Sequence, residues 1–304
     1  MGNITELLRA RQFQSGLVDG VFALAVVLLC ALTRLFGRRP PIVGALFAFA
    51  GVAALTGTGP GRRALDGVGF GCAFAVLLLF GGGLSSRALP GGLRLLLGPL
   101  LLAPGAIALG LAAHPHGVPW WAAVVLMVVV APCGVLAADF DQHHGDHALG
   151  PLLLVITVAG LYVTVPDTEG ARALMGVALP FVLVTLPGPL ARLGTGGAAA
   201  AIGLVAYDAA LEGIARPASM IGALGCIGLL ACEPVGRHLR WRRHRPEPVA
   251  RPEHLRIVAI AVVLQGVLVL WTSHVAGRVH SAPVAALLLA PAAIAGALAG
   301  ALLL

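Results

Sequence analysis

Two carboxylates in one apolar segment are the strongest candidates for chemistry in this chain. Asp208 and Glu212 lie four residues apart in the segment 197–214, so a helix places them on one face. Two ionised carboxylates repel each other in surroundings of low dielectric constant, and one of them then keeps its proton, as a proton carrier requires. The alternative is that the apolar helix ends near Val205 and that both groups meet water and lipid headgroups beside Arg216.

Asp19 is a further acidic candidate, because it lies about one turn inside the first long apolar segment. Ionisable groups within a membrane span are costly and are functional candidates for that reason. With the topology predicted below, Asp19 shares the outer side of the membrane with Asp208 and Glu212. An ordinary polar rim of the bundle is the simpler interpretation of these residues.

The stretch 139–147 has the residue types of a metal site. Asp139, His143 and His147 recur at every fourth position, and they line up on one face if the preceding helix continues through them. Gly145 weakens such a helix, and a solvated histidine-rich loop explains the same residues more simply. We retain the three side chains as candidate metal ligands.

The longest polar run in the chain, residues 236–256, contains seven arginines. Arginine-rich short loops stay on the cytoplasmic side of a membrane and attract anionic lipid headgroups. No basic face with stacking aromatic residues accompanies the run, so no nucleic-acid partner is predicted. The candidates for headgroup contact are Arg237, Arg240, Arg242, Arg243 and Arg245.

Composition indicates what must position these residues. Hydrophobic residues make up 59% of the 304 and charged residues 11%, whereas about a quarter of an ordinary soluble domain is charged. We therefore predict an all-α fold, a polytopic transmembrane helical bundle that forms one integral membrane domain over 1–304. The twenty basic residues are all arginine, which with the abundance of alanine, glycine and leucine indicates a high-GC bacterium and its plasma membrane.

About eleven segments approach the roughly 20 apolar residues that a membrane span needs. They are 16–36, 41–58, 67–85, 93–113, 118–138, 150–166, 171–190, 197–214, 218–233, 256–276 and 282–304.

A cytoplasmic 236–256 loop fixes the direction of every other segment. Alternation then places the loops 37–40, 86–92, 139–149 and 191–196 inside, the N-terminus outside and the C-terminus in the cytoplasm. Arginines lie in or beside three of these loops, as the positive-inside rule requires, while 139–149 is acidic. Arg62 and Arg63 fall on the outside and oppose the assignment.

Prolines fall inside several of the predicted helices, including Pro99 and Pro104 in 93–113 and Pro180 in 171–190. A proline leaves one backbone carbonyl without its helical partner, and a neighbouring helix must satisfy that carbonyl inside a membrane. We therefore expect the proline-bearing helices to lie within the bundle or to line a cavity.

Three classes of function fit these features. A multi-pass secondary transporter or permease of the inner membrane fits the number of segments, the broken helices and the acidic pair, and we favour it. A non-catalytic accessory or scaffold subunit of a membrane complex fits the lack of a clear catalytic or binding motif. A membrane-embedded enzyme for a lipid-linked substrate would use the 139–147 loop. No hydrolase, metalloprotease or nucleotide-binding motif is present, so a non-enzymatic role without a cofactor is favoured, with the bilayer and other membrane subunits as partners.

Cysteines introduced at Ala250 and Ser281, in a background without native cysteines, test this topology. A membrane-impermeant maleimide added to intact cells should label Ser281→Cys and leave Ala250→Cys unmodified, because the arginine-rich loop is inside and the loop 277–281 is outside. Both cysteines should react after lysis, which controls for thiol reactivity. Labelling of Ala250→Cys in intact cells contradicts the topology.

Overall fold

The described part of the chain is helical throughout. The computed structural model describes residues 40–58, 67–114, 169–185 and 193–213, together with isolated positions at 24–32, 117, 124 and 259–284. The prediction of an all-α fold is confirmed for this part. Its helices are α2 (Pro40–Thr58), α3 (Gly67–Ser86), α4 (Gly91–Ala113), α7 (Glu169–Thr185) and α8 (Gly194–Gly213).

These five helices correspond to five of the predicted apolar segments, and each begins within three residues of the predicted start. The other six segments lie wholly or partly outside the described residues. Over the residues that the structure describes, no helix is long and apolar enough to cross a membrane. As membrane spans, the segments therefore stay a prediction.

The close contacts between helices fix their relative directions. Along α2 and α8, Gly44 meets Gly197 and Gly51 meets Leu204, so these two helices are parallel. Against α3, α8 runs the other way, since Gly83 meets Gly196 while Leu79 meets Gly203. Similar contacts, Gly82 with Leu101 and Gly71 with Ala112, make α4 antiparallel to α3. The consecutive helices α2, α3 and α4 thus alternate in direction.

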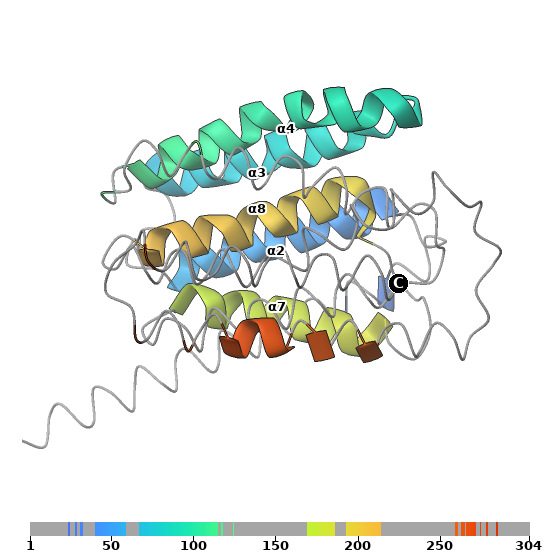
Figure 1. Cartoon of the computed structure of the whole chain (residues 1–304). Helices are drawn as coiled ribbons and strands as arrows, with labels where there is room; N and C mark the ends of the chain where they lie inside the picture. Colours follow the sequence, from blue (N-terminus) through green and yellow to red (C-terminus); the bar gives the residue numbers. More distant parts are fainter. Residues whose placement is uncertain are drawn as a thin grey trace, which may run out of the picture.

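The helices stack in layers (Figure 1). α3 packs on α4 to form one outer layer, α8 and α2 lie side by side in the middle, and α7 lies against α2 on the other side. Phe47 of α2 and Phe181 of α7 join these last two layers, with ring centroids 5.5 Å apart and ring planes at 69°. This is the edge-to-face geometry that aromatic rings prefer.

A short turn joins α3 to α4. Backbone hydrogen bonds from Arg87 N–H to the Leu84 carbonyl (3.1 Å) and from Ala88 N–H to the Ser85 carbonyl (3.0 Å) tighten the end of α3. Such turns are common at the end of a helix, where the last carbonyls have no helical partner. Pro90 then occupies the N-cap of α4 in extended conformation. The first residue of α8 is Gly194, whose φ of 64° is a backbone conformation that residues with a Cβ seldom adopt.

The proline-bearing helices divide into two cases. Pro180 of α7 is buried, as expected for a helix inside the bundle. The expectation is wrong for α4, which runs without a break from Gly91 to Ala113 through Pro99 and Pro104 and exposes Pro104 at the edge of the bundle. The reason is the next residue, Gly105, which faces α3 so closely that an added Cβ would lie 2.6 Å from the Leu79 nitrogen. The packing of Gly105 turns its neighbour Pro104 outward.

Glycines on three helices allow backbone to approach backbone around α8. An added Cβ at Gly83 of α3 would lie 2.6 Å from the Thr195 carbonyl oxygen and 2.9 Å from the Gly196 Cα. An added Cβ at Gly197 of α8 would lie 2.6 Å from the Gly44 Cα of α2. The obstacles are main-chain atoms, which cannot rotate away as a side chain can. Small residues at crossings of this kind are typical of helix pairs packed in membranes.

Gly83→Ala and Gly81→Ala form a matched pair that tests these contacts. The Cβ at Gly83 would overlap α8, and overpacking of this kind costs about 1–3 kcal/mol of unfolding free energy. No neighbouring atom lies within 4 Å of the Cβ position at Gly81, where alanine should be neutral or stabilise the helix by up to about 1 kcal/mol. Thermal unfolding of the purified variants measures both, and equal stability of the two contradicts the packing.

Candidate functional site at the carboxyl end of α8

The helix that carries the acidic pair is the innermost helix of the described bundle. Every side chain from Thr195 to Tyr207 is buried, including four successive alanines at 198–201. Successive positions on a helix point about 100° apart, so four in a row sample its whole circumference. α8 therefore presents no exposed face along this stretch, and α2, α3, α4 and α7 all contact it.

Asp208 and Glu212 follow directly on this buried stretch. The helix continues past Val205 to Gly213, so both residues lie on helical backbone. Whether their side chains meet water and lipid headgroups stays a prediction. Tyr207 is still buried, with 5% of its surface exposed, one residue before Asp208. The helical backbone places Asp208 one turn beyond Leu204 and Glu212 one turn beyond Asp208, along a single helix face. The sequence thus places both carboxylates at the end of the central helix.

The position of the pair within the helix is electrostatically unfavourable for two negative charges. The last turn of α8 contains no basic residue. The carboxyl end of a helix already carries partial negative charge, and an anionic side chain there is disfavoured by about 0.3–1 kcal/mol. A proton or a cation near this end relieves that cost. The sequence places no compensating charge within the helix itself.

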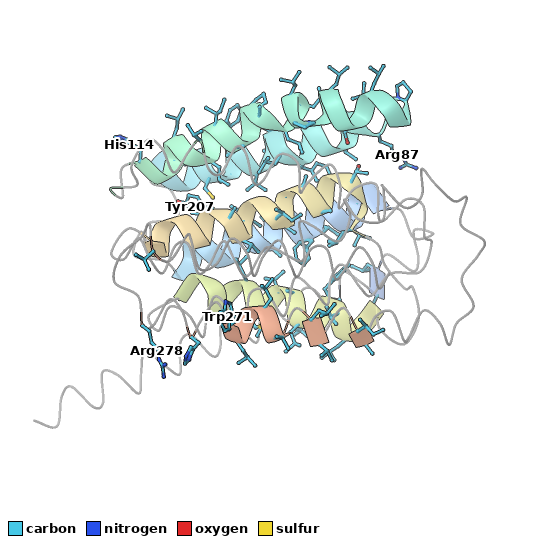
Figure 2. The ribbon with its side chains drawn as sticks, in the orientation of Figure 1. Arg87, His114, Tyr207, Trp271 and Arg278 are labelled. Atoms are coloured by element: carbon cyan, nitrogen blue, oxygen red, sulfur yellow. The ribbon has the colours of Figure 1, made fainter. Side chains whose placement is uncertain are left out.

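Labelled residues show which elements share this end of the bundle (Figure 2). Tyr207 of α8 and His114 at the end of α4 lie at the same end as Arg278, and Arg87 lies at the opposite end. α7 runs antiparallel to α2, since Gly51 meets Leu174 while Phe47 meets Phe181. Glu169 therefore begins α7 at the end where α2 and α8 finish. The backbone positions of Glu169, Asp208 and Glu212 therefore share this end of the bundle with Arg278. Which side of a membrane this end faces stays a prediction.

Buried polar side chains mark the other end of α8. In the described residues these are Ser86, which is fully buried, and Thr195, which is 3% exposed. The Ser86 hydroxyl donates a hydrogen bond of 2.7 Å to the Gly83 carbonyl, and so satisfies a carbonyl in the last turn of α3. Thr195 lies in the first turn of α8, whose backbone meets Gly83. This end is a structural junction of two helix termini.

The remaining predicted site residues lie outside the described residues. This holds for Asp19, for the candidate metal ligands Asp139, His143 and His147, and for the arginines 237–245. Within the described part of the chain, no group of three or more histidine, cysteine, aspartate or glutamate residues could hold a metal ion. Of the predicted sites, the structure therefore locates the Asp208 and Glu212 positions alone.

Two features of this region were missed by the sequence analysis. One is that α8 is central, for which its composition of Gly, Ala and Thr in 194–201 was the available signal. The other is the junction of Gly83, Ser86 and Thr195, for which the Gly81–Gly83 run and the Gly196–Gly197 pair were signals. Small residues permit close approach, but they do not indicate which helices approach each other.

Comparison of the chain with known protein families, with curated proteins and with solved structures finds no match in any of the three.

Proposed function

We propose that the chain is a multi-pass protein of a bacterial plasma membrane and acts as a secondary transporter or permease, with Asp208 as its proton carrier. The observation that carries the proposal is that the acidic pair ends the buried central helix. An ionisable group at such a place, within a chain of 59% hydrophobic residues, is a functional candidate because a charge within a membrane span is costly. We further propose that the chain crosses the membrane about eleven times, with the N-terminus outside.

The surface of the bundle supports a membrane setting. Large apolar side chains are exposed on the helices around α8, among them Phe49 of α2 (75% exposed), Leu77 of α3 (67%) and Leu183 of α7 (60%). Soluble monomers seldom expose extended apolar patches, which mark contact with other proteins or with a membrane. Gly, Ala and Thr fill much of the central helix, and several Leu and Phe side chains of the other helices face outward. This distribution of small and large residues suits a bundle surrounded by hydrocarbon.

In this proposal Asp208 titrates and Glu212, one turn further along, modulates it. A second carboxylate close by favours the protonated form of the first, and the negative end of α8 acts in the same direction. Proton binding at Asp208 would cancel the charge at the end of the central helix. Proton release toward one side and binding from the other, coupled to a solute, is the step that a proton-driven permease requires.

The accessory or scaffold alternative is favoured by a different observation. Contacts at Gly44, Gly83, Gly196 and Gly197 leave no room for a single Cβ between α8 and its neighbours, as suits a rigid structural core. Both functions accommodate that packing, and the role of Asp208 separates them. The enzyme alternative depends on the 139–147 loop, which lies outside the described residues.

Asp208→Asn tests the transport proposal, because it keeps size and hydrogen bonding but removes the titrating proton. Purified protein is placed in vesicles that contain a pH-sensitive dye and is challenged with a panel of small solutes. We expect wild type to give a solute-dependent pH change, Asp208→Asn to lose it with unchanged thermal stability, and Glu212→Gln to retain part of it.

Glu169→Gln is the matched control, because Glu169 lies at the same end of the bundle but begins a helix, where a carboxylate is favourable. It should leave the pH change intact. An Asp208→Asn variant that equals wild type in both the pH change and stability would remove the main support for transport. Wild type that responds to no solute, with Asp208→Asn equally stable, would favour the scaffold.

A further inference from the structure

The outward face of α4 carries an unbroken line of apolar side chains. Its exposed positions follow one another at intervals of four and three residues, the spacing of a single helix face. They are Leu93, Leu97, Leu100, Pro104, Ile107 and Leu111. Leu100 and Leu111 are the most exposed of them, at 65% and 64%. From Leu93 to Leu111 the line follows about 27 Å of helix axis at 1.5 Å per residue.

Polar groups border this line at its two ends. Arg87, in the turn before α4, is exposed, and His114, at the C-cap of α4, is exposed at the opposite end of the bundle (Figure 2). Between Leu93 and Leu111, every exposed α4 side chain that the structure describes is apolar. Such a distribution, apolar in the middle and polar at both ends, matches a surface with hydrocarbon between two polar boundaries.

The absence of small residues from this line favours lipid over another helix as the occupant. The closest approaches between helices of this molecule each involve a small residue: Gly105 of α4 lies against Leu79, and an added Cβ at Gly71 of α3 would lie 3.4 Å from the Ala112 Cβ of α4. Small residues mark helix-to-helix contacts in membranes because they let backbones approach. The outward line of α4 has leucine and isoleucine instead, and its Gly98 and Gly110 lie on the buried side.

We propose that the outward face of α4, from Leu93 to Leu111, is in direct contact with lipid acyl chains and forms a lipid-facing edge of the bundle. The inference rests on the membrane setting proposed above, but not on transport or on Asp208. Phe74 and Leu77 of the adjacent helix α3 are also exposed, at 60% and 67%, and add apolar surface to the same outer layer. Arg87 and His114 mark the polar boundaries of the edge.

Spin labels on single cysteines test this assignment. The labelled variants Leu100→Cys and Ile107→Cys, in a background without native cysteines, are placed in vesicles of phosphatidylethanolamine and phosphatidylglycerol. Molecular oxygen concentrates in hydrocarbon, whereas a charged nickel complex stays in water. We expect oxygen to relax both labels strongly and the nickel complex to leave them unaffected. Arg87→Cys, at the polar boundary, is the matched control and should show the reverse preference.

Two results overturn the proposal. Relaxation of the Leu100 and Ile107 labels by the nickel complex would place this face in water. Protection of both labels from oxygen as well as from nickel, with dipolar broadening between labels, would place a second copy of the chain on α4. Neither result depends on proton transport, so the lipid-facing edge and the role of Asp208 fail independently of each other.

Discussion

The close approach of the α8 backbone to α2 and α3 is the constraint on which the rest of the described structure depends. Gly44 and Gly197 touch through their main chains, and Gly83 rests on the Thr195 carbonyl. At these points no side chain separates the backbones, so the three helices are nearly in contact there, and larger residues such as Leu79 and Leu204 pack further along the same helices. α8 is therefore the buried centre. The layer of α3 and α4 lies on one side of the α8 and α2 pair, and α7 lies on the other.

Two properties of the molecule accompany that centre. Large apolar residues such as Phe49 and Leu100 lie on the outside, in addition to those that fill the core, such as Leu79 and Phe181. The two carboxylates of α8, Asp208 and Glu212, lie at the end where its helix dipole is negative and no basic residue of its last turn compensates them. The first property is the basis for a proposed hydrocarbon environment, and the second for a proposed proton site.

Sequence patterns predicted the helices but not their arrangement. Apolar runs bounded by Gly, Pro or charged residues placed the start of α3 at the correct residue, Gly67, and the start of α8 within three residues. The same runs have almost no one-sided pattern, because nearly every position is apolar, so periodicity could not identify α8 as central or α4 as peripheral. The outward position of Pro104 was likewise unpredictable, since it follows from the fit of Gly105 against Leu79 across the chain.

The most direct test of a central α8 is leucine substitution at each of its four successive alanines, 198–201. These positions sample every face of the helix, and all four are buried. We expect each substitution to lower the unfolding free energy by about 1–3 kcal/mol or more, as overpacking of a close-packed core does. Ala45→Leu, on an exposed position of α2, should leave stability unchanged. If one of the four α8 variants is as stable as wild type, α8 has a free face and is not the centre of the bundle.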